Sequence, residues 1–340
     1  MIKMYQVQNH SGSSAEFWDD LWESEPGSYY DPVCMCENSR LWSLIESKIQ
    51  KERLFLEGGC GPGHWVRYYY DRGFRVLGID FAHRTIENLR RINPALDVRV
   101  ADICHIPAAD GQVHVYYSGG VVEHFESGPE PALLEAKRVL ARDGWFLCSI
   151  PDANWLRQGL LYRNASFDKA VYNGKLAIRQ VKRTEIEPLC GDRPFFQYAF
   201  CEDEFRAYLE QAGFQVMETF GYALIWGLFE IPGFKPTYEI FHRLARLMFY
   251  RSRPRVSSRG TCLSGRQAAL EAMDGLVAAS GSQIKGANVK QSDKTPAKGM
   301  PFLLKRALVR EDPNLPILGP MIRTLSNHMA NMRMYVAKPI

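Results

Sequence analysis

A glycine-rich turn constrains this chain more than any other feature of its sequence. Residues 54–64 read LFLEGGCGPGH, in which an apolar run and an acid precede Gly59, Gly61 and Gly63. Glycine keeps such a turn tight and lets a ligand approach the backbone, and the N-terminus of a following helix offers unbonded N–H groups. The segment indicates a strand, a nucleotide-binding turn and a helix, although a glycine-rich turn alone also occurs as a plain strand-to-helix connection.

Strands and helices alternate around this turn. The pattern predicts strands at 53–58, 74–80, 97–102, 113–119 and 145–151, and helices at 64–72, 83–91 and 129–142. A helix at 202–212, a sixth strand at 215–220 and a seventh at 333–338 follow. Such alternation is typical of an α/β fold in which helices cover both faces of a mainly parallel sheet.

Asp80 narrows the ligand class. It ends the second predicted strand, 17 residues after Gly63, where a carboxylate can accept hydrogen bonds from both hydroxyls of a ribose. A dinucleotide oxidoreductase is disfavoured because its usual pattern is Gly-x-Gly-x-x-Gly, and here the third glycine comes one residue early.

Four segments, in this order, resemble the class I S-adenosylmethionine (SAM)-dependent methyltransferases, especially the small-molecule branch related to ubiquinone and menaquinone biosynthesis. They are the cofactor motif Glu57-x-Gly59-x-Gly61-x-Gly63, the ribose-binding strand end Asp80-Phe81, the adenine-binding turn Ala101-Asp102-Ile103 and residues 119–125 after the fourth strand. The similarity covers roughly residues 50–152, 196–220 and 332–340. It implies SAM as the cofactor.

The resemblance also implies a fold and a division of the chain. We expect a Rossmann-like, doubly wound seven-stranded sheet whose last strand is antiparallel, with a mostly helical insertion before that strand. The expected parts are 1–50 (N-terminal cap and entrance helices), 51–152 (SAM-binding core), 153–195 (acceptor-side insertion), 196–220 with 332–340 (rest of the core sheet) and 221–331 (basic insertion with a linker at 280–299).

The same resemblance assigns cofactor-binding residues. They are Glu57, Gly59, Gly61, Gly63, Asp80, Phe81, Asp102, Ile103 and Gly119. Glu57 would attract the ammonium of the methionine moiety, or else accept hydrogen bonds from backbone N–H groups. Asp102 would accept the adenine amino group while Ile103 covers the ring, or else Asp102 is a turn residue.

Residues after strands four and five are candidates for the acceptor side. His124 is the best-placed general base if the acceptor is a hydroxyl, and its alternative is packing near the cofactor. Glu123 beside it has a helix-start role as its alternative. Asp152 and Asn154 would orient the acceptor, or else serve as turn and N-cap residues.

Two further segments stand out. The aromatic stretch with Phe17, Trp18 and Trp22 resembles the family's entrance segment, which folds over the cofactor, and simple capping of the sheet is the alternative. Residues 221–331 carry 16 Lys and Arg against 7 Asp and Glu. We expect this insertion to roof the acceptor pocket, and its basic helix at 238–250 suits an anionic surface or a solvated edge.

Features that the sequence lacks narrow the range of possible functions. The formal net charge is only +4, and no apolar stretch approaches the roughly 20 residues that cross a bilayer. The first residues lack a secretory core, so a cytoplasmic protein is expected, peripheral to a membrane if the basic insertion docks there. The eight cysteines show no zinc spacing, and no metal is expected. The sequence lacks the Asn/Asp-Pro-Pro-Tyr/Phe signature of many enzymes that methylate adenine or glutamine amides. It also has no Pro-Cys dipeptide, which disfavours the usual cytosine-C5 methylation.

The sequence therefore predicts a SAM-dependent methyltransferase that moves a methyl group to an O or N atom of a small, partly apolar metabolite by in-line displacement. Nucleic acid is disfavoured as a partner. The alternatives are a SAM-fold binding or assembly subunit without turnover, and a methyltransferase for a membrane-associated lipid or lipid-linked acceptor. The acceptor itself, its methylated atom and the oligomeric state are left open.

Overall fold

The structure is a computed structural model. It describes residues 2–6, 14–24, 32–37, 39–157, 170–172, 176–179, 195–228, 311 and 318–340.

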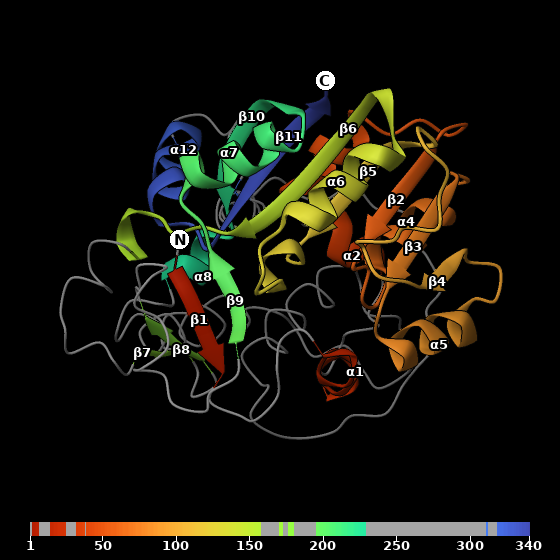
Figure 1. The fold of residues 1–340 in the computed structure, drawn as a ribbon, viewed down its shortest axis with the longest axis horizontal. Helices are drawn as coiled ribbons and strands as arrows, with labels where there is room; N and C mark the ends of the chain where they lie inside the picture. Colours follow the sequence, from red (N-terminus) through yellow and green to blue (C-terminus); the bar gives the residue numbers. More distant parts are fainter. Residues whose placement is uncertain are drawn as a thin grey trace, which may run out of the picture.

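A seven-stranded sheet forms the centre of the molecule (Figure 1), in the order β10-β11-β6-β5-β2-β3-β4. The strands are β2 (Leu54–Gly58), β3 (Val76–Asp80), β4 (Val98–Val100), β5 (Val113–Gly119), β6 (Leu140–Pro151), β10 (Phe214–Tyr222) and β11 (Met332–Pro339). Only β11 runs antiparallel to its neighbours β6 and β10, and the other adjacent pairs are parallel. This confirms the predicted Rossmann-like sheet with its antiparallel last strand.

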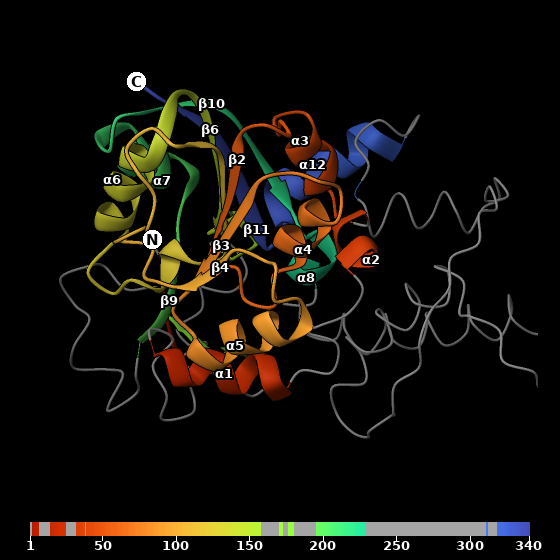
Figure 2. The ribbon, with the colours of Figure 1, turned by 90° about the vertical axis from the view of Figure 1, so that its right-hand side faces the viewer.

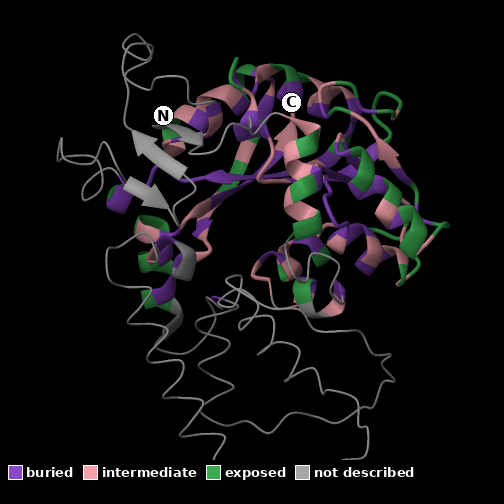
Figure 3. Ribbon diagram, turned by 90° about the horizontal axis from the view of Figure 1, so that it is seen from below, coloured by how far each residue is buried: buried purple, intermediate pink, exposed green. Residues whose placement is uncertain are grey.

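Helices cover both faces of the sheet, as Figure 2 shows along its edge. One face carries α6 (Glu130–Val139) and α7 (Glu202–Gln211), and the other carries α3 (Leu41–Glu46), α4 (His64–Tyr70) and α12 (Leu318–Met329). The remaining helices among the described residues are α1 (Ala15–Ser24), α2 (Pro32–Glu37), α5 (His83–Ile92), α8 (Leu224–Leu228) and the short 3₁₀ helix η1 (Val122–His124). Every residue of β2 and β3 is buried, as expected for parallel strands packed on both faces, and Figure 3 shows this burial along the sheet.

The boundary between α6 and β6 corrects one prediction. The expected helix at 129–142 ends at Val139, and Leu140 already has extended backbone angles, φ −75° and ψ 134°. Leu140 pairs with Val113 at the start of β5, and its side chain is buried. As part of β6, the backbone of Leu140 pairs with β5. A further turn of helix would move this backbone away from the sheet.

A second, four-stranded sheet was not predicted. It has the order β7-β8-β1-β9, formed by β7 (Ala170–Tyr172), β8 (Leu176–Arg179), β1 (Ile2–Gln6) and β9 (Phe195–Ala199). β1 lies between β8 and β9 and is antiparallel to both. The expected N-terminal cap of helices therefore includes a strand as well, and that strand joins the N-terminus to the region after β6.

Both ends of the basic insertion are attached to the sheet edge. The buried carboxylate of Glu311 accepts hydrogen bonds from Leu224 N at 2.5 Å and Ser326 Oγ at 3.2 Å, and lies 3.6 Å from the guanidinium of Arg40. Near its end the insertion forms the helix α12, which agrees with the expected mostly helical character of this region. The basic helix expected at 238–250 and the linker expected at 280–299 lie outside the described residues.

A buried ion pair closes the end of the sheet after β6. Arg333 donates from Nε to Asp152 Oδ2 at 3.0 Å and reaches Glu202 Oε2 at 2.7 Å. Asn154 Oδ1 accepts from Arg157 N at 2.9 Å, which is the N-cap geometry. The Asn154 contact supports its cap interpretation, whereas the Asp152 carboxylate forms an ion pair with Arg333 rather than a turn.

Replacing Asp152 by Ala should destabilise the fold strongly. The change leaves a buried guanidinium without its main partner, which typically costs about 3–5 kcal/mol. Urea unfolding measures this cost. The matched control is Glu87→Ala, which removes an exposed partner of Arg91 and should change the free energy of unfolding by about 0.5 kcal/mol or less. Equal losses in the two variants would contradict the structural role of the buried pair.

Candidate active site

The glycine loop lies between the carboxyl end of β2 and α4, and it is closely packed. Gly59 and Gly61 have φ of +69° and +48°, in the region that L side chains rarely adopt. A Cβ atom on Gly59 would lie 2.3 Å from Cγ2 of Val121, and one on Gly61 would lie 3.0 Å from Cε2 of Trp22. The loop backbone thus packs directly against Val121 and Trp22, with Gly61 buried, at the switch point where the strand order reverses from β2 to β5.

Asp80 holds this loop in place. Its Oδ2 accepts a hydrogen bond from Gly61 N at 2.8 Å and its Oδ1 accepts one from Ala82 N at 2.9 Å. Burial raises the pKa of Asp80, and the two backbone donors oppose that rise. A carboxylate oxygen can accept more than one hydrogen bond, so holding the loop does not exhaust the acceptor capacity of Asp80.

Glu57 supports the helix that follows. Its Oε2 accepts a hydrogen bond from Val66 N, in the first turn of α4, at 3.0 Å. Burial raises the pKa of Glu57 to about 8, opposed by the backbone donors Val66 and Trp65. The structure thus shows the backbone-binding role that the sequence left open, and a contact with an ammonium stays a prediction.

The other predicted cofactor residues lie around the loop with different exposure. Phe81 is half-buried directly after Asp80. Asp102 is exposed, and its Oδ1 accepts from Cys104 N at 2.8 Å, as in an Asx turn. Ile103 is only 4% exposed and packs in the core on the α6 side, so its role over a ring stays a prediction. Gly119 ends β5, where a Cβ would lie 2.2 Å from the Tyr117 hydroxyl.

His124 is buried in an aromatic cluster. Its Nδ1 lies 2.7 Å from the backbone oxygen of Phe196, and its ring packs edge-on against Trp18 and Phe196 at 4.9 and 5.0 Å between centroids. Because a carbonyl oxygen only accepts, Nδ1 carries the proton of the neutral ring. Burial lowers the pKa of His124 to about 4, against the opposing effect of the Phe196 carbonyl. His124 is therefore neutral near pH 7 and a weak base.

Helix α1 covers the glycine loop through Trp22, which stacks on Trp18. Figure 1 shows α1 on the side toward which β2 points, and Figure 2 shows it beside α5. Asp19 fixes α1 there: its Oδ1 accepts from both N and Oγ1 of Thr85 at 2.8 Å, and its Oδ2 from Arg84 N at 3.2 Å. Asp19 thereby caps the N-terminus of α5 from a distant part of the chain.

The role of Asp19 was missed from the sequence. A signal for it exists, because Ala82 at the N-cap of α5 has no side-chain acceptor, so the free N–H groups of that helix need a partner from elsewhere. The sequence alone does not tell which of the chain's acids supplies it.

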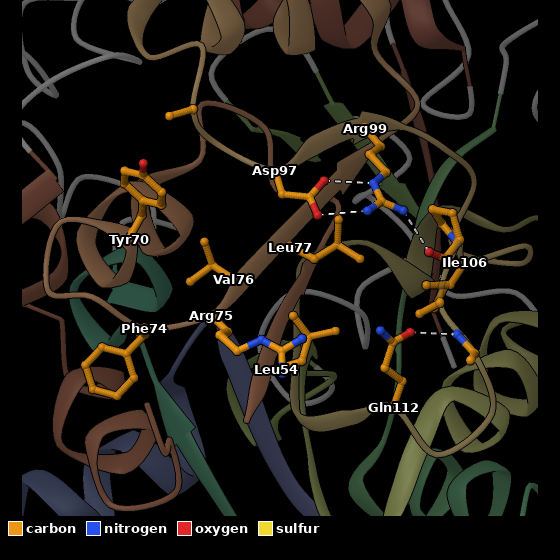
Figure 4. A pocket seen from close by; sticks show the side chains of 14 residues that line it. Leu54, Tyr70, Phe74, Arg75, Val76, Leu77, Asp97, Arg99, Ile106 and Gln112 are labelled. Carbon is orange, nitrogen blue, oxygen red and sulfur yellow. Dashed lines mark hydrogen bonds and ion pairs between the residues drawn. The ribbon is translucent and has the colours of Figure 1, made fainter. Parts of the chain in front are cut away.

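A cavity of about 710 Å³ lies at the opposite edge of the sheet (Figure 4). Its lining includes the amino ends of β2, β3 and β4, where Arg99 pairs with Asp97 at 2.8 Å. Ligands of open α/β sheets bind at the carboxyl ends of the strands. The cavity therefore lies away from the glycine loop and is not part of the candidate site.

Comparison with known proteins finds similarity to methyltransferases, in agreement with the sequence motifs. Residues 56–148 match the family described as "Methyltransferase domain". A probable S-adenosylmethionine-dependent methyltransferase of Mycolicibacterium smegmatis is 33% identical over 97 residues, which cover 28% of this chain and 37% of that protein. A malonyl-[acyl-carrier protein] O-methyltransferase of Serratia marcescens is 31% identical over 103 residues, 30% of this chain and 40% of that protein. The chain thus spans less than half of these two relatives.

Among solved structures, a TehB-like SAM-dependent methyltransferase from Corynebacterium glutamicum aligns with a TM-score of 0.39 and 19% identity. The alignment covers 61% of this chain and 86% of that one.

The pKa of His124 gives a test of the site's geometry. NMR titration of the imidazole should show a neutral ring down to about pH 4. Between the unfolded value near 6.5 and this folded value, the unfolded chain binds a proton that the folded chain does not, so stability falls as the pH is lowered. The fall should total about 3 kcal/mol for this residue. In His124→Gln, this component of the pH dependence should be absent, and a His124 that titrates near 6.5 would contradict the burial.

Proposed function

Since residues 56–148 form a class I SAM-dependent methyltransferase domain, we propose that this chain transfers a methyl group from SAM to an O or N atom of a small, partly apolar acceptor. The observation that carries the proposal is the bare glycine backbone, held by Asp80 and covered by α1. The loop carries no side chain at Gly59 and Gly61, where Val121 and Trp22 pack against its backbone, and it lies at the switch point of the sheet, where ligands of such folds bind.

The residues present fit the cofactor. The backbone of residues 59–63 would bind its polar chain, and the remaining acceptor capacity of Asp80 suits the ribose hydroxyls. Glu57 and Asp80 are both buried, and the charge of Asp80 adds to the rise in the pKa of Glu57. A cationic ligand would relieve this mutual repulsion. When bound, SAM supplies an activated methyl group, and the protein's part is to position the acceptor and exclude water.

The aromatic cluster over the loop supports a partly apolar acceptor. Phe17 and Trp18 of α1 pack against Phe196 of β9, with ring centroids 5.9 and 6.5 Å apart. Phe17 and Trp18 belong to the segment that the sequence assigned to the entrance, and Phe196 directly follows the expected acceptor-side insertion at 153–195. They provide an apolar wall that keeps water from the reacting atoms.

An oxygen acceptor agrees with the name of the Serratia relative, an O-methyltransferase. The lipid-linked alternative depends on the basic segment at 238–259, which lies outside the described residues. In the part of the chain that the structure describes, no helix is long and apolar enough to cross a membrane.

Substitution of Gly61 tests the cofactor site. Gly61→Val should reduce the affinity for S-adenosylhomocysteine by about 100-fold or more, because the side chain collides with Trp22 and disfavours positive φ. Isothermal titration of folded protein measures this. The matched control is Gly73→Val, since Gly73 also has positive φ, +78°, but a Cβ there meets no atom within 4 Å. The control loses stability but keeps its affinity, and equal affinities for the two variants would contradict the proposed loop.

Asp80→Ala tests the ribose contact. The change removes charge-assisted hydrogen bonds and the acceptor that holds Gly61, so binding should weaken by about 1.5–3 kcal/mol. The same titration measures it, with Asp97→Ala as a control, because Asp97 is an acid at the opposite edge of the sheet. Wild-type affinity in Asp80→Ala would leave Asp80 with a purely structural role.

Transfer itself is tested by incubating the protein with methyl-labelled SAM and a panel of phenols, carboxylic acids and amines, and following the label into product. Tight binding of SAM without product from any panel member or metabolite extract would favour a binding subunit instead.

A further inference from the structure

Glu123 lies at the carboxyl edge of the sheet, next to the glycine loop. It belongs to η1, which follows β5 directly, and Val121 at the start of that turn packs against Gly59. The side chain of Glu123 is almost entirely buried, with 1% of the residue exposed. Glu123 is therefore shielded from solvent, and one short turn of the chain separates it from the proposed cofactor site.

One oxygen of this carboxyl group lacks a partner. Among the residues that the structure describes, no group donates a hydrogen bond to Glu123 Oε2 or accepts one from it. Buried polar atoms are almost always paired in folded proteins, so an orphaned carboxyl oxygen beside a candidate ligand site suits contact with a bound group. The neighbouring Glu57 and Asp80, by contrast, each use carboxylate oxygens on backbone donors.

The surroundings of Glu123 place it on the acceptor side. A Cβ on Gly120 would lie 3.5 Å from Glu123 Oε1 and 3.9 Å from Cε of Met332, so these three residues surround one point at the strand ends. Burial, and to a smaller extent the charge of Glu123, raises the pKa of Tyr222, whose hydroxyl donates to Ser149 Oγ at 2.8 Å. Tyr222 ends β10 and Met332 begins β11, so Glu123 faces the place where the 221–331 insertion leaves and re-enters the sheet.

The two adjacent candidates for proton transfer differ in their environment. His124 already donates to Phe196, and burial lowers its pKa to about 4. Burial raises the pKa of Glu123 to about 8, opposed only by its own backbone N–H. Among the described residues, the charge of Glu123 raises the pKa of Cys148 on β6 and of Tyr222 on β10, in each case after the larger effect of burial, and His124 adjoins it on η1. A base is most effective when its pKa lies near the working pH.

Building on the proposed function, we propose that Glu123 is the catalytic base of this site: its Oε2 contacts the nucleophilic O or N atom of the acceptor and takes the proton from it. The acceptor's bond to hydrogen breaks, and an O–H bond forms on Glu123. An electron pair of the acceptor atom forms the new bond to the methyl carbon, and the pair of the broken carbon–sulfur bond stays on sulfur. Charge and atoms balance without any other reactant, and Glu123 returns its proton to solvent.

The decisive comparison is between Glu123→Gln and Glu126→Gln. Glutamine keeps the shape of the side chain but takes no proton, and Glu126 is an exposed glutamate three residues further along the same segment. Each variant is titrated with S-adenosylhomocysteine and then assayed with methyl-labelled SAM and the panel of phenols, carboxylic acids and amines. Infrared difference spectra of the S-adenosylhomocysteine complex, wild type minus Glu123→Gln, follow ionisation of the Glu123 carboxyl group without need of an acceptor.

We expect Glu123→Gln to bind S-adenosylhomocysteine like the wild type and to lose about 100-fold or more in kcat. The wild-type rate should rise with pH around 8, and this rise should be absent in Glu123→Gln but present in Glu126→Gln. The carboxylic acid band should vanish over the same pH range.

Three results would overturn the proposal. They are a Glu123→Gln rate within about threefold of wild type, an unchanged pH profile, and a Glu123 carboxyl group that ionises near the usual glutamate value. A wild-type protein that binds no S-adenosylhomocysteine would instead refute the proposed function, and the assignment of Glu123 with it.

Discussion

The glycine loop is the constraint on which the other parts of the site depend. Its backbone passes so close to Val121 and Trp22 that side chains on Gly59 and Gly61 would collide with them. Positive φ at both glycines makes that approach available at no steric cost. The loop thereby fixes η1 on one side and α1 on the other, and Asp80 ties it to β3. Three separate stretches of chain meet at this turn because no side chain intervenes.

A second recurring feature is the burial of titratable side chains whose hydrogen bonds only partly compensate for the loss of water. Glu57 and Asp80 are both buried beside the loop, where backbone donors stabilise their charged forms only in part. Burial raises the pKa of a carboxyl group and lowers that of an imidazole, so Glu123 and His124 diverge although they are adjacent in sequence. The fold thus places acids that gain from a positively charged ligand next to a histidine that stays neutral.

The fold and the loop could be predicted because their signals are local and repeated. Apolar runs mark β2 and β3, glycines mark the turn, and Asp80 follows at the expected strand end. Contacts between distant segments were not predictable. Nothing in residues 2–6 indicates pairing with β8 and β9, and the choice of Asp19 as the cap of α5 depends on how α1 packs. Leu140 prefers a helix locally, but pairing with Val113 determines its conformation.

The four-stranded sheet links the two regions that lie over the candidate site, the N-terminal region and the region after β6. β1 comes from the N-terminus and β9 from the region after β6, and they pair directly. Phe196 of β9 holds His124 through its backbone oxygen and contacts Trp18 of α1 through its ring. A shift of β9 would therefore move the histidine's partner and the aromatic wall together. Because the regions 1–50 and 153–195 share this sheet, changes in acceptor preference would involve both of them rather than the later region alone.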